Sequence, residues 1–208
     1  MSTMTRRGLT AALLAAFAAT AAAMQAWAQQ APTTRLRGTI EKVDGNTLLL
    51  KTRDGGELTL TLADDALIVS VVKASLADIK EGSFIGSGAM PQADGSQKAL
   101  EVHIFADSQR GTGEGHRPWA GAPNSTMTNG TVGTMVTGVE GPTITVKYKD
   151  GEKKIVVPPG VPIVRYEIAG RSELKPGASF TVLAATKKAD GTFSAGRINV
   201  GRDGVVPQ

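Results

Sequence analysis

The stretch RGTIEKVDGNTLLLKTRDGGELTLTL (residues 37–62) has a counterpart later in the chain, NGTVGTMVTGVEGPTITVKYKDGEKKIVV (residues 129–157). Both open with Gly-Thr and a β-branched residue, pass through a turn and a strand-like segment, and reach an Asp-Gly turn before a further strand. Two later pairs of segments match in the same order, residues 75–85 with 172–182 and residues 93–104 with 189–200. Because chance similarity does not preserve order, the sequence predicts an internal repeat.

Each copy has the pattern of antiparallel β-structure. Leu58, Leu60 and Leu62 alternate with threonines, a period of two that buries one face of a strand. Asp-Gly dipeptides, whose glycine tolerates the positive φ of tight hairpins, begin at residues 44, 54, 94, 150 and 190. The sequence therefore predicts an all-β fold of short hairpins.

One break in this pattern occurs in each copy. Ser75 and Ser172 are good N-cap residues, and each is followed by a few residues and then a glycine, which favours a short helix. Three strands, a short helix and two strands (β-β-β-α-β-β) is the chain order of an OB-like barrel. We therefore predict two tandem small antiparallel β-barrels. The alternative is a pair of small open sandwiches.

The N-terminus has the features of a secretory signal. Arg6 and Arg7 precede an apolar run over residues 9–24, and Ala26-Trp27-Ala28 matches the small residues of a cleavage site. We expect cleavage after Ala28, export to the periplasm by the general secretory or the twin-arginine route, and no transmembrane segment in the mature chain. An uncleaved anchor is the alternative.

The predicted organisation follows from the signal and the repeat. It comprises a signal peptide (1–28), an N-terminal extension (29–36), barrel module 1 (37–105), an inter-module loop (106–128), barrel module 2 (129–203) and a C-terminal tail (204–208). The chain has no cysteine, so its stability must come from packed cores rather than disulfides.

Charge and composition argue against nucleic-acid binding. Loss of Arg6 and Arg7 reduces the 23 basic residues to 21, against 19 acidic residues, a net charge of +2. Binding of single strands requires aromatic side chains in a basic groove, and aromatic residues make up only 4% of the chain. We expect no nucleic-acid partner.

The loop 106–128 contains the unusual segment RGTGEGHRPW, residues 110–119. It is either a flexible linker or an ordered loop that packs on module 1, and Arg110, Arg117 and Trp119 are its candidate contact residues. It lacks the lysine of a P-loop, and its glycines have the wrong spacing for a dinucleotide site. The sequence contains no cysteine nucleophile or convincing acid–base pair, so we predict that the protein is not an enzyme.

A metal site is the sharper hypothesis for this region. The two histidines of the chain occur in Glu101-Val102-His103 and Glu114-Gly115-His116. Leu100, Val102 and Ile104 are expected to point inward on their strand, so Glu101 and His103 would share its outer face. If the loop folds back across that face, Glu101, His103, Glu114 and His116 could together bind Zn²⁺ or Cu²⁺.

The copies resemble a bacterial secreted family known as domain of unknown function 5666. The residues that carry the resemblance are Gly38-Thr39-Ile40 and Leu76–Gly82 in the first copy, and Gly130-Thr131-Val132 and Leu174–Gly177 in the second. The resemblance implies exported OB-like modules and no catalytic residues. We therefore expect an exported, non-enzymatic binding or structural protein of the cell envelope, with an unidentified envelope protein or ligand as partner. A periplasmic metal-binding protein is the alternative.

Overall fold

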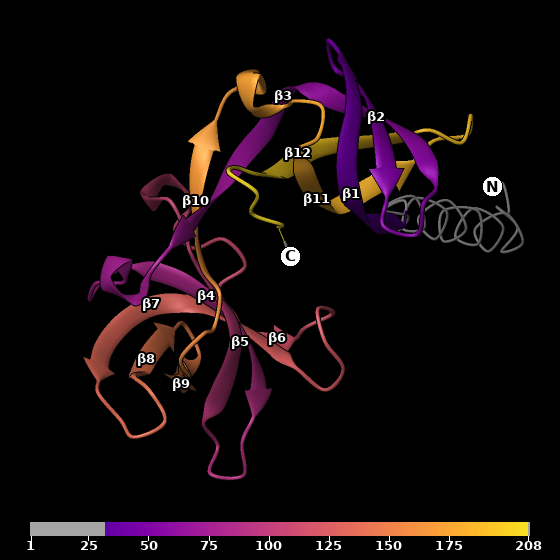
Figure 1. Cartoon of the computed structure of the whole chain (residues 1–208). Helices are drawn as coiled ribbons and strands as arrows, with labels where there is room; N and C mark the ends of the chain where they lie inside the picture. The colour runs from indigo at the N-terminus through magenta and orange to yellow at the C-terminus, as the bar shows by residue number, and fades with distance from the viewer. Residues whose placement is uncertain (1–31, 208) are drawn as a thin grey trace, which may run out of the picture. The chain divides into compact units, whose positions relative to one another are not determined.

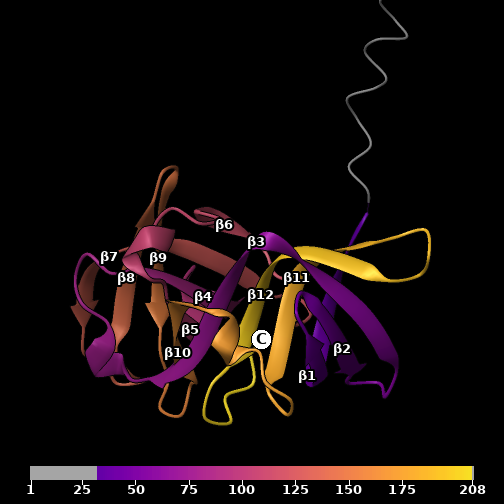
Figure 2. The same ribbon diagram turned by 90° about the horizontal axis from the view of Figure 1, so that it is seen from above.

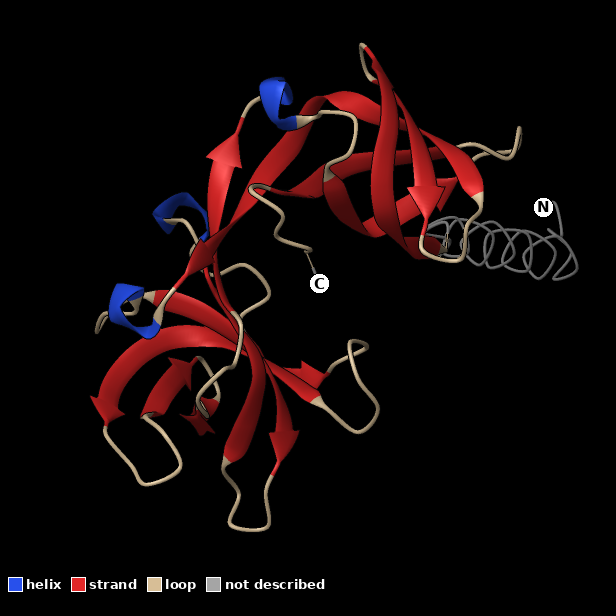
Figure 3. Cartoon of the chain, viewed as in Figure 1, coloured by secondary structure: helices blue, strands red, loops and turns tan. Residues whose placement is uncertain are grey.

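The computed structural model describes residues 32–207, and the long elements there are all strands (Figure 3). The strands are β1 (Thr33–Asp44), β2 (Thr47–Thr52), β3 (Glu57–Ala74), β4 (Phe84–Pro91), β5 (Gln97–Ile104), β6 (Gly115–Pro118), β7 (Thr126–Val136), β8 (Thr143–Tyr148), β9 (Gly151–Val156), β10 (Ile163–Ala169), β11 (Ser179–Lys187) and β12 (Phe193–Gly201). Three short 3₁₀ turns complete the fold: η1 (Leu76–Asp78), η2 (Asp107–Gln109) and η3 (Arg171–Glu173). The all-β prediction is confirmed. The predicted signal peptide, residues 1–28, lies outside the described residues.

Five strands form a closed barrel, three from the early part of the described chain and two from its late part. β1, β2 and β3 pair antiparallel in chain order, and the far edge of β3 pairs with β12 in parallel. β11 pairs with β12 and lies next to β1, where Ile40 N donates to Ala178 O at 2.9 Å. The barrel order is therefore β1-β2-β3-β12-β11.

The middle of the chain forms a second group of strands in the same order. β7, β8 and β9 pair antiparallel in sequence, and β4 pairs with both β7 and β5. β5 and β9 pair in parallel at Gln97–Ile155 and Lys98–Val156. The order β7-β8-β9-β5-β4 thus repeats the order of the first barrel with the matching strands of the other copy.

The two copies have therefore exchanged their last hairpins, β4–β5 and β11–β12. In Figures 1 and 2 the yellow β11 and β12 lie with the indigo β1 and β2, at the opposite end of the colour scale. The predicted modules 37–105 and 129–203 do not each close on their own strands, and all twelve strands belong to one continuous sheet. The tandem arrangement of the predicted barrels is corrected accordingly.

The length of β3 explains the exchange. β3 runs for 18 residues, with a bulge after Leu62 where its pairing with β12 shifts register. It pairs with β12 of the barrel from Leu60 to Val71, and its second half also pairs with β10 from Ile68–Ala169 to Ala74–Ile163. The chain thus leaves the first barrel before β4 begins, and β4–β5 packs on β7–β9 instead.

The hydrophobic cores follow the exchange rather than the sequence repeat. One cluster of buried side chains combines residues 36–68 with residues 174–200, and includes Ile40, Leu60 and Phe180. The other combines residues 79–104 with residues 132–157. The predicted inward residues Leu60 and Leu62 are buried, and Leu58 packs beside them.

Local features of the repeat agree with the sequence. The glycines of all five predicted Asp-Gly turns have positive φ, as tight hairpins require. Asp94 accepts hydrogen bonds from Ser96 N and Oγ, at 2.9 and 2.7 Å, and Asp190 accepts the same pair from Thr192. The predicted short helices are the single turns η1 and η3. Ser75 is the N-cap of η1 as predicted, whereas the N-cap of η3 is Gly170 and the predicted Ser172 lies inside the turn. The predicted extension 29–36 is corrected, because β1 begins at Thr33.

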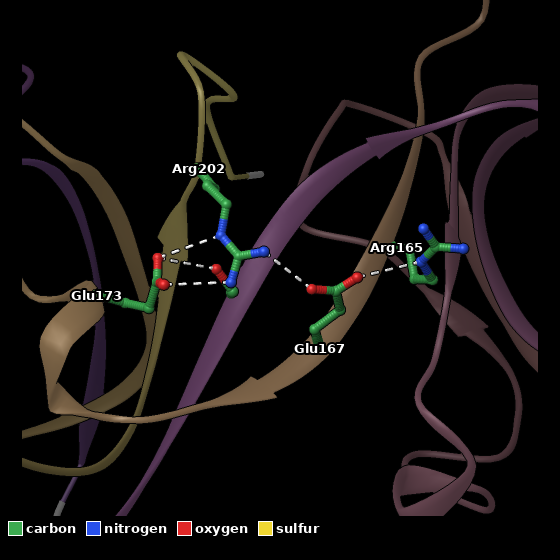
Figure 4. Close-up of polar contacts among 5 residues, drawn as sticks. Arg165, Glu167, Glu173 and Arg202 are labelled. Atoms are coloured by element: carbon green, nitrogen blue, oxygen red, sulfur yellow. Dashed lines mark hydrogen bonds and ion pairs between the residues drawn. The ribbon is translucent and has the colours of Figure 1, made fainter.

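A network of charges lies where β3 and β10 run side by side (Figure 4). Arg202 follows β12 and forms ion pairs with Glu167 of β10 at 3.0 Å and with Glu173 of η3 at 3.2 Å. Glu167 also accepts from Arg165 at 3.4 Å, and Ser70 of β3 donates to Glu173 at 3.3 Å. These contacts connect the end of the exchanged β12 to β3, to β10 and to the turn that follows β10.

The inter-module loop 106–128 is ordered and packs back onto the strands. Its β6 pairs with β7, and the Trp119 N–H donates to Ser125 O at 2.9 Å. Trp119 lies over Gly88 of β4, where a Cβ atom would come within 2.5 Å of the indole ring. Of the two predicted alternatives, the ordered loop is therefore the one observed. Across residues 32–207, no helix has the length and apolar character needed to span a membrane.

Candidate functional site

A cavity lined by three arginines lies among residues that the hairpin exchange brings together. We call it the arginine cavity, because Arg35 of β1, Arg117 of β6 and Arg197 of β12 all line it. Its volume is about 300 Å³. The other lining residues are Glu101, His103, Phe105, Thr112, Gly113, Pro118, Trp119, Ala120, Met127, Asn129, Tyr166 and Leu183.

The alternation of the strands places the three arginines. Leu36 and Ile198 are buried in the barrel core, so their neighbours Arg35 and Arg197 project from the outside of the barrel. Arg117 comes from the other side, on the short edge strand β6, and its Nη1 donates to Gly113 O at 2.6 Å. Strands from both ends of the chain and the central loop therefore bring three guanidinium groups to one cavity.

None of these three guanidiniums forms an ion pair with a carboxylate in residues 32–207. Arg197 Nε donates to Asn199 Oδ1 at 3.1 Å, and the buried Nε of Arg35 has no hydrogen-bond partner there. Burial lowers the pKa of both Arg35 and Arg197. The cavity thus holds positive charge that is partly desolvated and that no ion pair neutralises.

Glu101 is the one carboxylate that lines the cavity. Its side chain is only 13% exposed, and this burial raises its pKa, although the charges of Arg35 and Arg37 oppose the shift. Its Oε1 lies 3.8 Å from His103 Nδ1, too far for a hydrogen bond. Glu101 therefore cannot neutralise three arginines, and its carboxylate can accept hydrogen bonds from a ligand.

His103 is buried, which differs from the exposed outer-face position that the sequence predicts. It is 5% exposed and stacks on Tyr166, with ring centroids 5.0 Å apart and planes within 7°. Phe105 meets both rings edge-on. Burial and the charges of Arg197 and Arg117 lower the pKa of His103 to about 3, so this imidazole is neutral at physiological pH. Burial also raises the pKa of Tyr166.

The predicted metal ligands do not assemble. His116 Nδ1 lies 2.8 Å from Thr128 Oγ1, and Glu114 Oε1 accepts from the Lys149 N–H at 3.0 Å, while Glu101 and His103 line the cavity. Within the described part of the chain, no three His, Asp or Glu side chains gather as a metal site. The four-residue metal site is therefore corrected. β5 faces the cavity, and the loop brings Arg117 and Trp119 there instead of His116.

The candidate contact residues have separate roles. Arg117 and Trp119 line the cavity, as a contact surface in this loop would require. Arg110 does not line it: its Nη2 donates to Gly82 O at 2.9 Å and lies 3.7 Å from Asp107. Arg110 thus fastens η2 to the turn before β4.

Sequence reasoning missed Arg35, Arg197 and Tyr166. One signal was present in the aligned repeats, where Glu101-Val102-His103 corresponds to Arg197-Ile198-Asn199. Each copy places two polar residues on the outer face of its last strand, β5 in the first copy and β12 in the second. The second residue of each pair, His103 or Asn199, is buried. Buried polar side chains at equivalent positions mark a surface that is covered in both copies.

Comparison of this chain with models of protein families, with curated proteins and with solved structures gave no match.

Proposed function

We propose that the chain is an exported, non-enzymatic binding protein whose ligand is a small anion held in the arginine cavity. One observation carries this proposal: Arg35, Arg117 and Arg197 line one cavity without a carboxylate partner among the described residues. Guanidinium groups present fixed, forked donors that match carboxylate, sulfate and phosphate oxygens. An anion in the cavity supplies negative charge that Glu101 alone does not provide for three arginines.

The chemistry of the other polar residues favours binding over catalysis. A histidine whose pKa is about 3 is a weak proton acceptor at neutral pH, and His103 is held between aromatic rings. Arg35 and Arg197 cannot exchange protons at neutral pH. These groups bind and orient an anion.

We also propose that both groups of strands are OB-like barrels. The order β1-β2-β3-β12-β11 and the matching order β7-β8-β9-β5-β4 support two OB-like barrels with exchanged hairpins. The N-terminal sequence supports export to the periplasm. The resemblance to the secreted family of domain of unknown function 5666 stays a prediction.

Thermal unfolding in the presence of sulfate, phosphate and carboxylates tests anion binding. Ligands that bind the folded state raise the midpoint with concentration. We expect this rise in the native chain, and its loss in the double variant Arg35→Gln/Arg197→Gln. Arg110→Gln removes a half-exposed arginine outside the cavity and should keep the effect. Equal responses in both variants, or none in the native chain, would refute the proposal.

A further inference from the structure

We infer that the ligand is a compact, hydroxylated ring acid, of the size and polarity of a hexuronic acid, whose ring stacks on Trp119. This inference rests on the proposed function and specifies its ligand. It depends on the apolar wall of the arginine cavity and on unpaired donors and acceptors among its lining residues.

Trp119 is held as a fixed wall. Its backbone N–H donates to Ser125 O at 2.9 Å, and Ser125 Oγ donates to Ala122 O at 2.5 Å, which holds the turn that carries Trp119. The indole lies against Gly88 and Gly121, and a Cβ atom at either position would overlap the ring. The two glycines thus leave room for a half-exposed indole that borders the cavity.

The apolar surface continues around this indole. Pro118, Met127 and Leu183 also line the cavity, and Leu183 is 51% exposed. A bare inorganic anion makes no use of such a surface, whereas the flat faces of a ring cover it and displace water. The ligand therefore carries a ring beside its anionic group.

The polar lining requires hydroxyl groups as well. The Nε of Arg35 is a buried donor without a partner, and the Oδ1 of Asn129 is a buried acceptor without one among the described residues. Glu101 contributes a second acceptor to the cavity. A ligand made only of acceptor oxygens would face repulsion from Glu101. A hydroxyl group of the ligand can donate to the Glu101 carboxylate.

The volume limits the ligand to a small molecule. At about 300 Å³ the cavity lies at the lower end of the range for small-molecule sites. One substituted six-membered ring is a better match to this space than a chain of several rings. A carboxylate on that ring faces the guanidiniums.

Tryptophan fluorescence tests the inference directly. Trp27 and Trp119 are the two tryptophans of the chain, so Trp27→Phe in the full chain leaves Trp119 as the reporter. We expect galacturonate or glucuronate to change its emission and, by calorimetry, to bind at least tenfold more tightly than sulfate, galactose or benzoate. Sulfate tests charge alone, galactose tests the hydroxylated ring alone, and benzoate tests a ring acid without hydroxyls.

The outcomes separate this inference from the proposed function. If sulfate binds as tightly as the uronates and Trp119 emission is unchanged, the anion site stands and the ring acid is refuted. If benzoate matches the uronates, the requirement for hydroxyl groups is refuted. If none of the anionic probes binds, neither the uronates nor sulfate nor benzoate, both proposals fail.

A variant of the wall provides the second measurement. Trp119→Leu should reduce the preference for uronate over sulfate to threefold or less, and Leu100→Ala, an exposed apolar residue outside the cavity, should leave it unchanged. Thermal unfolding verifies that each variant is folded. An unchanged preference in folded Trp119→Leu would overturn the stacking arrangement.

Discussion

At the scale of single residues, His103 links the cavity to the stability of the fold. Its pKa is about 3 in the folded protein, against about 6.5 in an unfolded chain. Below pH 6.5 the unfolded state therefore binds a proton that the folded state refuses. Stability that is present above that pH is lost as the pH falls toward 3.

The expected loss from His103 is about 2–3 kcal/mol between pH 7 and pH 4.5, a large share of a typical folding free energy. Urea unfolding at both pH values measures it. His103→Gln removes the titrating group and should flatten this dependence, whereas His116→Gln removes a half-buried imidazole and should flatten it much less. A native-like pH dependence in folded His103→Gln would show that other groups are responsible.

Gly88 gives a second prediction at this scale. Its φ is not in the left-handed region, so alanine is compatible with its backbone, but the added Cβ would overlap the Trp119 ring. Gly88→Ala should cost about 1–3 kcal/mol in unfolding free energy and shift Trp119 fluorescence. Gly196→Ala, in an exposed position of β12 with open space around the added Cβ, is the control. Equal losses in the two variants would argue against tight packing at Gly88.

At the scale of elements, the exchanged hairpins can be tested by cross-linking, because the chain has no cysteine of its own. Thr61 of β3 pairs with Ser194 of β12, whose repeat counterpart is Lys98 of β5. Thr61→Cys/Ser194→Cys should form a disulfide on mild oxidation, detected by loss of free thiols and by mass. Thr61→Cys/Lys98→Cys should remain reduced. The reverse result would establish barrels without exchange.

The strands and turns could be predicted from sequence because their signals are local. The alternating leucines and the Asp-Gly dipeptides determine burial and φ within a few residues of themselves. The partner of each hairpin could not be predicted in this way, since both copies offer equivalent edges. One signal was present: no glycine or proline occurs from Glu57 to Ala74, so β3 had no place to turn. In the second copy, Pro158, Pro159 and Pro162 interrupt the matching segment between β9 and β10.

The cavity was harder to predict because it also depends on pairing between strands that are far apart in the sequence. Arg117 and Trp119 stood out because their loop has an unusual composition. Arg35 and Arg197 lie on ordinary strands, and only the pairing of β12 with β3 brings them near β5 and the loop. A site made by long-range pairing leaves little trace in local sequence.

At the scale of the whole molecule, the two cores are coupled through one strand. Each core has its own five strands, but β10 pairs with β3 of one barrel and with β5 of the other, so one continuous sheet joins them. We expect a single calorimetric unfolding transition, with Leu60→Ala in one core and Ile144→Ala in the other each moving that whole transition to lower temperature. Two separate transitions, each sensitive to one variant, would indicate independent units.

The position of β12 also determines the order in which a growing polypeptide can fold. β1 is among the first strands to leave the ribosome, yet its barrel closes only when β12, ending at Gly201, has been synthesised. The strands from β4 to β9 are all available earlier. Nascent β1, β2 and β3 must therefore wait, with the free edges of β1 and β3 unpaired, until β11 and β12 have been made after the strands of the other barrel.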